Sequence, residues 1–166
     1  MTNGAISIGL LAYLAHCTRS PMIFPSLGST AFLIFHEPLA TASCPRNVLL
    51  GHTLAIAVGL LVLLAMGLGG VSSDLSEGIR LSRIVAAGLS MALTSGLMVL
   101  LDISHPPAAS TTLIVSLGLM NELWQMPFLA CGIGLIVLQG FAFNRLVGIR
   151  YPLWENDTHG KKPLLS

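Results

Sequence analysis

Two short segments of the sequence, FPSLGST and HPPAAST, hold the side chains with the clearest chemical potential. In each segment a proline and small residues precede hydroxyl side chains, and a new apolar run begins there. Hydroxyl groups and the free N–H groups of a helix start donate hydrogen bonds, and the helix dipole is positive at that end, so both segments favour an anion. Alternatively, the hydroxyls bond back to carbonyls one turn earlier and the prolines only kink the chain. The candidate substrate-binding residues are Ser26, Gly28, Ser29, Thr30, Ser110 and Thr111.

A third segment, CPRNVLLGH, stands at the start of an apolar run and contains Arg46, Asn47 and His52. A guanidinium can form paired hydrogen bonds to an oxyanion, so Arg46 is predicted to attract or bind an anion, with Asn47 beside it. The alternative is an arginine that extends toward lipid headgroups. His52 lies about one and a half helical turns deeper than Arg46.

Asp102 and His105 flank the second hydroxyl segment. An ionisable residue at membrane depth is a functional candidate by default. We expect His105 to contact the substrate, and His52, Asp102 and His105 to act in gating or proton coupling. The sequence equally allows both histidines to be hydrogen-bonded packing residues. A further alternative is an intramembrane enzyme that uses Asp102 and His105.

The composition of the chain determines what surrounds these residues. Of 166 residues, 54% are hydrophobic and only 9% are charged, whereas soluble domains carry roughly 25% charged residues. Membrane lipid is therefore the expected solvent for most of the surface. A net charge of +1 argues against nucleic-acid binding, which needs a basic stripe. No metal-ligand spacing, cofactor motif or nucleophile–base pair occurs, so we expect no metal, no cofactor and no enzymatic activity.

Apolar runs predict an all-α membrane protein. Residues 49–70, 84–101 and 127–143 are long enough to cross a hydrocarbon core of about 30 Å, and residues 2–19 make a fourth, shorter span. Residues 26–35 and 107–119 would reach only about half of that thickness. Each of these two starts at a proline, which suits the first turn of a helix. We therefore expect four transmembrane helices and two re-entrant half-helices.

The chain also resembles itself at an offset of about 81 residues. This offset places Pro25 on Pro106, Ser29 on Ser110 and Thr30 on Thr111. We expect a single transmembrane domain over residues 1–150, with repeats at 1–70 and 80–147. Internal repeats are common in transporters, whose binding sites lie where the repeats meet.

Basic residues predict the orientation of the four spans. The loop 71–83 and the C-terminal tail would share one side and carry most of the arginine and lysine residues. The positive-inside rule then places both termini in the cytoplasm, here of a bacterial plasma membrane. With an even number of spans per repeat, the two repeats would be parallel. The tail, residues 151–166, is polar and is expected to be disordered.

The HPP tripeptide followed by small residues, together with PRNVLLGH before an apolar span, resembles the HPP family of integral membrane proteins. The resemblance covers residues 8–146 and implies four transmembrane segments and, for some members, nitrite transport. It assigns His105, Pro106 and Pro107 to the family signature. A second block carries over to Pro45, Arg46, Asn47, Gly51 and His52. Other members often have glycine soon after the prolines, where this chain has Ala109.

Together these arguments predict a transporter or channel for a small inorganic anion, with nitrite as the best candidate. The anion would bind between the two half-helix starts, and a chain with so few spans is expected to form a homo-oligomer. Two alternatives stay open: a pathway for a neutral solute or a cation, and a membrane scaffold or sensor that transports nothing.

Overall fold

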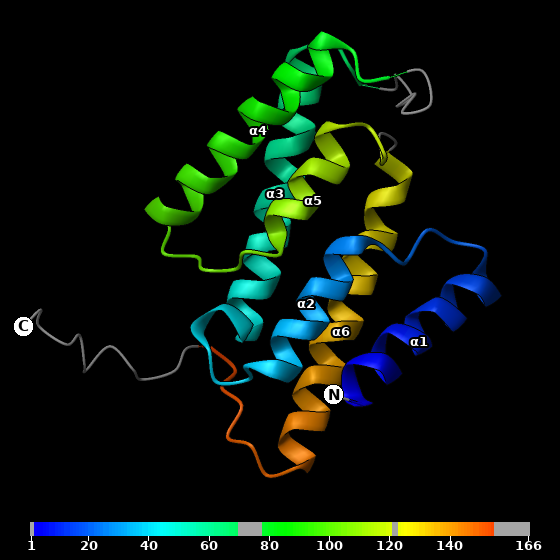
Figure 1. Ribbon diagram of the computed structural model, residues 1–166, viewed down its shortest axis with the longest axis vertical. Coiled ribbons are helices and arrows are strands. Elements are labelled where there is room, and N and C mark those ends of the chain that lie inside the picture. Colours follow the sequence, from blue (N-terminus) through cyan, green and yellow to red (C-terminus); the bar gives the residue numbers. More distant parts are fainter. Residues whose placement is uncertain (1, 70–77, 121–122, 155–166) are drawn as a thin grey trace, which may run out of the picture.

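The computed structural model describes residues 2–69, 78–120 and 123–154, and within these ranges the secondary structure is entirely helical (Figure 1). Two short 3₁₀ helices accompany six α-helices. The elements are α1 (Thr2–Thr18), α2 (Pro25–His36), η1 (Thr41–Ser43), α3 (Pro45–Ala65), α4 (Leu81–Leu100), α5 (Ala108–Ser116), η2 (Leu123–Gln125) and α6 (Met126–Leu146).

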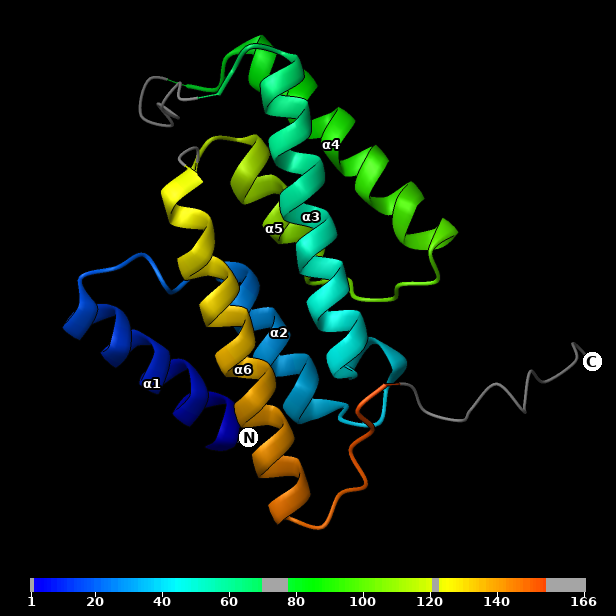
Figure 2. The ribbon, with the colours of Figure 1, turned by 180° about the vertical axis from the view of Figure 1, so that it is seen from behind.

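The centre of the molecule is formed by α3 and α6, which contact each other and run in opposite directions (Figures 1 and 2). Each has 21 residues and a proline in its first turn. Pro45–Ala65, Leu81–Leu100 and Leu123–Leu146 are long and apolar enough to cross a membrane. The chain is therefore a membrane protein, but four complete spans are not confirmed, because α1 has only 17 residues.

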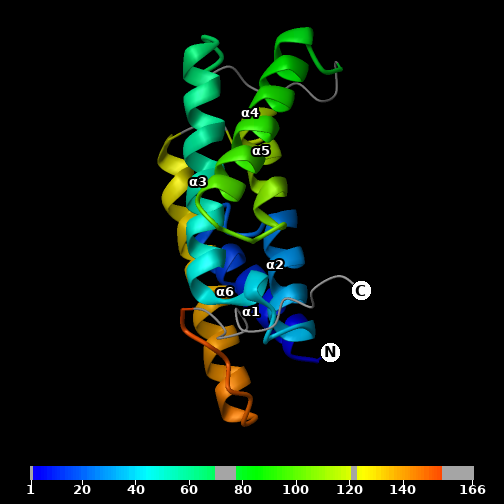
Figure 3. The same cartoon turned by 90° about the vertical axis from the view of Figure 1, so that its left-hand side faces the viewer.

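The remaining helices form two antiparallel hairpins, α1–α2 and α4–α5, whose tips lie near the middle of the molecule (Figures 1 and 3). Both tips reverse the chain in the same way. Arg19 and Asp102 adopt positive φ angles of 50° and 52°. The next N–H in each case donates five residues back, from Ser20 to the Ala15 carbonyl at 3.2 Å and from Ile103 to the Met98 carbonyl at 2.9 Å. This left-handed cap is a common way to end a helix.

Helices form at both segments that the sequence predicted as half-helices, although their bounds differ from expectation. α2 has 12 residues and begins at Pro25, one residue before the predicted segment 26–35. α5 has only nine residues and ends at Ser116, three residues before the predicted end. The difference arises at Gly118, whose φ of 78° ends the helix with a residue that tolerates a left-handed conformation.

Each hairpin packs on the long helix of the other half of the chain. α1 and α2 contact α6, whereas α4 and α5 contact α3, and the two half-helices α2 and α5 contact each other. Glycines permit the close approach. Gly59 of α3 faces Val115 of α5, and Gly140 of α6 faces Ile34 of α2. The two glycines are again 81 residues apart, and so are the residues they face, Ile34 and Val115.

The orientation argument from the sequence does not agree with this arrangement. Because α3 and α6 are antiparallel, the halves 1–70 and 80–147 cannot be parallel repeats (Figure 1). The start of α4, with Arg80 and Arg83, lies at the opposite end of the molecule from the end of α6, with Arg145. Hydropathy does not distinguish a complete span from one arm of a hairpin. For this reason the sequence wrongly predicted parallel repeats, with the start of α4 on the same side as the end of α6.

The tail is also ordered further than expected. Tyr151 is fully buried, and its hydroxyl donates to the Ser43 carbonyl. Trp154 lies against Arg46, with the guanidinium carbon 5.8 Å from the ring centroid. Disorder was therefore the wrong expectation for residues 151–154, and residues 155–166 lie outside the described ranges.

Candidate functional site

His52 of α3 lies fully buried between the two half-helices. Its Nε2 is 2.9 Å from Thr30 Oγ1 of α2, and its Nδ1 is 2.8 Å from Thr111 Oγ1 of α5. Both threonines are completely buried. One imidazole therefore joins the two hydroxyls that the sequence offset makes equivalent.

His105 completes this cluster from the loop before α5. Its Nε2 lies 3.2 Å from His52 Nε2 and 3.3 Å from Thr30 Oγ1. The two rings meet edge to face, with centroids 4.9 Å apart and an interplanar angle of 62°. We call Thr30, His52, His105 and Thr111 the His–Thr cluster.

The hydrogen bonds determine the proton positions within the His–Thr cluster. His105 Nδ1 must donate to the Ala42 carbonyl, 2.7 Å away, so its Nε2 is an acceptor in the neutral ring. His52 then carries its proton on Nε2, shared between Thr30 Oγ1 and His105 Nε2, and its Nδ1 accepts from Thr111. Thr30 donates its own proton to the Ser26 carbonyl at 2.8 Å. The neutral cluster is fully hydrogen-bonded.

The backbone at the second half-helix start is not free, contrary to the sequence-based expectation. The N–H groups of Ala108, Ala109 and Ser110 donate to the carbonyls three residues earlier, at 3.0–3.1 Å. Pro107 precedes the helix in an α conformation, and this geometry closes tight turns at the helix start. The donors available at this site are therefore side-chain groups rather than backbone N–H groups.

Several predicted hydroxyl positions lie outside the His–Thr cluster. Gly28 and Ser29 are exposed, and Ser29 bonds back to the Ser26 carbonyl at 3.0 Å. The alternative of local back-bonding therefore holds for Ser29. Ser110 is half-buried, and Ser26 Oγ is buried with no hydrogen-bond partner among the described residues.

Arg46 positions the second hairpin tip instead of lying among the histidines. Its Nη1 donates to Asn47 Oδ1 at 3.2 Å and to the Asp102 carbonyl at 3.5 Å. Asn47 is fully buried, and its Nδ2 donates to the Thr41 carbonyl at 3.0 Å. The Asp102 side chain is exposed. These three residues support the loop that presents His105.

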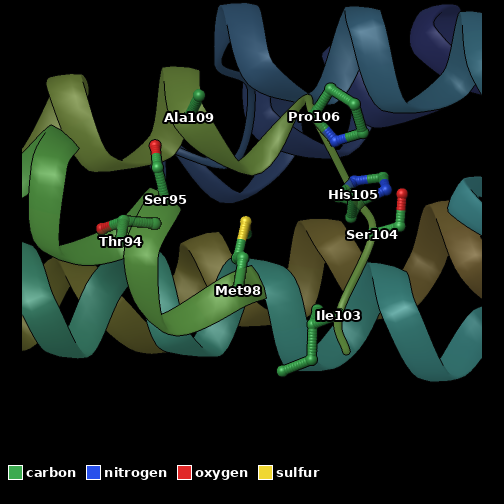
Figure 4. Close-up of a pocket in the computed structure, with 8 residues that line it drawn as sticks. All are labelled: Thr94, Ser95, Met98, Ile103, Ser104, His105, Pro106 and Ala109. Atoms are coloured by element: carbon green, nitrogen blue, oxygen red, sulfur yellow. The ribbon is translucent and has the colours of Figure 1, made fainter. Parts of the chain in front are cut away.

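A cavity of about 340 Å³ opens beside His105, between α4 and the hairpin tip (Figure 4). Pro106 borders it, whereas Pro107 is buried. Thr94, which also lines the cavity, accepts a hydrogen bond from Thr112 at 3.1 Å. Neither threonine is among the binding residues chosen from the sequence, although Thr112 stands directly beside Thr111 in the second hydroxyl segment.

Buried carboxylates are absent from the described part of the chain. Its two acidic residues, Glu37 and Asp102, are both exposed. No group of three potential metal ligands occurs among the described residues. The chemistry available at the site is therefore that of imidazole and hydroxyl groups.

Comparison with known proteins gives the same family that the motifs suggested. The chain is 26% identical over 160 residues to a transmembrane protein of Dictyostelium discoideum, and the match covers 92% of this chain and 52% of that relative. The chain thus spans about half the length of the curated relative it matches. No solved structure matches it. The model of the HPP transmembrane region matches residues 1–152, and the chain therefore belongs to the HPP transmembrane family, a family associated with transport.

Proposed function

We propose that this protein moves a small inorganic anion across the membrane, with nitrite as the best candidate, and that the anion passes the His–Thr cluster. The observation that carries the proposal is the burial of two histidines and two threonines where the half-helices meet. Buried polar groups in a membrane protein are costly and are typical of a substrate or ion pathway.

The types of side chain at this site, imidazoles that can take up a proton and no buried carboxylate among the described residues, support an anion over a cation. Cation pathways are lined by carboxylates or carbonyl rings, whereas anion pathways use positive or hydrogen-donating groups. Within the described residues no carboxylate is buried. Transport also accounts for the buried polar groups better than a passive scaffold, because side chains from three helices and a loop converge on one place.

We further propose that the two halves are inverted repeats. Three observations support this relation. The hairpin tips match at Arg19 and Asp102, the glycine contacts match, and each hairpin packs on the long helix of the other half. Inverted repeats place a substrate site at their interface near the bilayer midplane. The His–Thr cluster occupies that interface.

The same cluster offers a way to couple transport to a proton. In the neutral network the Nε2 of His105 is the acceptor that faces another imidazole. A proton added there would require His52 to move its own proton to Nδ1 and Thr111 to turn its hydroxyl into an acceptor. We propose that this exchange accompanies passage of the anion. Asp102, being exposed at the hairpin tip, would act only by positioning.

We also propose that the protein forms a homo-oligomer in a plasma membrane, with both termini cytoplasmic. Large apolar side chains are exposed along α4, among them Leu81, Ile84 and Val85. Such a surface suits lipid or a second copy of the chain.

Flux of nitrite into liposomes that contain the purified protein tests the proposal. Thr111→Val keeps the side-chain shape but removes the hydroxyl that bonds His52, so we expect nitrite flux to fall about tenfold, as for the loss of one hydrogen bond to a charged or ionisable group. Thr53→Val is the control, because Thr53 is exposed on α3, next to His52 in the chain, and bonds only locally, to the Leu49 carbonyl at 2.7 Å.

Flux equal to that of empty liposomes for nitrite, nitrate, formate and chloride would overturn anion transport. A scaffold or sensor would then be the better interpretation. Equal nitrite flux in the Thr111→Val and Thr53→Val variants would show that the His–Thr cluster is not part of the pathway.

A further inference from the structure

The interface between α4 and α5 carries a row of buried hydroxyls beyond the His–Thr cluster. Ser90 and Thr94 lie one turn apart on α4, and Thr112 and Ser116 lie one turn apart on α5. A spacing of four residues places each pair on one helix face. All four side chains are at most 1% exposed. We call this row the hydroxyl seam.

The hydroxyl seam is continuous with charged or ionisable groups at both ends. At its outer end, Arg83 is 5% exposed and donates through Nη1 to the Ser116 carbonyl at 3.3 Å. Gly118 leaves room for that guanidinium, since a Cβ there would lie 2.7 Å from Arg83 Nη2. At the inner end, Thr94 lines the same cavity as His105.

Two hydroxyls of the seam have no partner in the described structure. Ser90 Oγ and Ser116 Oγ are buried without any hydrogen bond to a described residue. Leaving a buried polar atom unpaired is unfavourable, so such atoms usually bind water or a polar solute. Their position along one row favours a chain of water or a hydrated solute between the helices.

The first hairpin has the same shape but not the same polarity. A cavity of about 350 Å³ lies beside its tip and is lined by Ile23, Phe24, Pro25 and Gly28, with Ile8. The first four are the counterparts, 81 residues earlier, of Ser104, His105, Pro106 and Ala109 in the cavity of the second hairpin.

The row of hydroxyls is missing from the first hairpin as well. At the same offset Ala31 replaces Thr112, and Phe35 replaces Ser116. The α1 helix contributes Leu11, which is fully buried in the apolar core beside Ala31. The packing is therefore repeated, whereas the positions that carry the seam hydroxyls on α5 are apolar on α2; the buried hydroxyls of the first hairpin, Ser7, Ser26 and Thr30, stand at other positions.

We propose that the hydroxyl seam is the route by which a small hydrated oxyanion reaches the His–Thr cluster, and that the first hairpin is closed to ions. This inference rests on the proposed anion transport. Arg83 attracts the anion at the outer end, and the hydroxyls replace part of its hydration. In the cavity, Thr94, Ser95 and Met98 of α4 lie across from Ser104 and His105 of the hairpin tip (Figure 4).

Water access to the two cavities can be compared directly by cysteine labelling in liposomes. Cys17 and Cys131 are exposed, so both are first replaced by alanine. Single cysteines are then introduced as Ser95→Cys and Ser104→Cys in one cavity, and as Ile8→Cys and Ile23→Cys in the other. We expect a negatively charged, water-soluble thiosulfonate to modify the first pair and not the second, and the modification to block nitrite flux.

Removal of single hydroxyls gives a test that does not depend on labelling. Ser90→Ala and Ser7→Ala each delete a fully buried hydroxyl that has no partner among the described residues, one on α4 and one on α1. Neither change should lower the unfolding temperature, because no hydrogen bond is lost. We expect Ser90→Ala to reduce nitrite flux about tenfold and Ser7→Ala to leave it unchanged.

The outcomes separate this inference from the proposed function. If nitrite flux is present but labelling favours the cavity of the first hairpin, or Ser90→Ala transports normally, the hydroxyl seam is not the route. If labelling follows expectation but no anion crosses, the cavity beside His105 is open to water and anion transport itself is overturned.

Discussion

At the residue scale, His52 is the residue to which both half-helices form a hydrogen bond. Thr30 and Thr111 come from helices that run in opposite directions, yet each bonds one nitrogen of the same ring. A shift of either helix would break one of these bonds and leave one contact of the ring unmade. His105 responds in turn, because it shares the proton of His52 Nε2.

The sequence identified all four members of the His–Thr cluster as candidates, but not their common position. Thr30 and Thr111 could be selected because they repeat at a fixed offset after a proline. Their neighbours Ser29 and Ser110 share that offset and still lie outside the cluster. The face that a helix presents depends on its rotation against its neighbours, which the hydroxyl spacing alone does not determine.

Tyr151 supports the first half of the chain from a segment expected to be disordered. Burial raises the pKa of its hydroxyl, which therefore stays protonated as a donor to the Ser43 carbonyl. We predict that Tyr151→Phe destabilises the protein by about 1 kcal/mol, the usual cost of one lost hydrogen bond. Thermal unfolding in detergent measures the change. Tyr13→Phe is the control, since Tyr13 is 65% exposed, and equal shifts for both variants would contradict the prediction.

At the element scale, glycines set the distance between each half-helix and its long helix. The starts of α2 and α5 were predictable from prolines, because proline fits only the first turn. The packing of α5 on α3 was not predictable, because a glycine in an apolar run indicates close helix packing but does not indicate which helix packs there.

Gly59 provides a test of this packing. A Cβ at this position would lie 2.9 Å from the Cβ of Val115, so Gly59→Ala should force α5 away from α3 and destabilise the protein by about 1–3 kcal/mol. The second change Val115→Gly removes that Cβ and should relieve the clash, which a double-mutant cycle of unfolding temperatures would show. Gly134→Ala is the control, because nothing lies within 4 Å of a Cβ there. A missing rescue would mean that the two residues do not limit the contact.

At the scale of the whole molecule, the two hairpins enter from opposite ends. The tip of each lies near the middle of the molecule (Figure 1). The first hairpin begins toward the end of the molecule where α3 starts, whereas the second begins at the opposite end, where α3 ends. The sequence predicted a helical membrane protein correctly. It could not provide the direction of the helices, because apolar length is the same for a crossing helix and for an arm that turns back.

This arrangement predicts on which side single residues are accessible. Ile79, before α4, and Arg150, after α6, are both exposed and lie at opposite ends of the molecule. In oriented membrane vesicles without other accessible cysteines, Ile79→Cys and Arg150→Cys should react with an impermeant thiol reagent from opposite sides. Reaction of both from the same side would instead favour the four-span topology expected from the sequence.

The exchanged packing of the hairpins has a consequence for biosynthesis. The first hairpin, α1–α2, packs mainly on α6, the last helix described in the chain, and less extensively on α5 and, through Thr30 and His52, on α3. While a ribosome is still producing the middle of the protein, that hairpin lacks its main docking surface. Insertion of the first helices must therefore stay provisional until α6 arrives, and a chain cut before α6 would leave its first hairpin without its main partner in the bilayer.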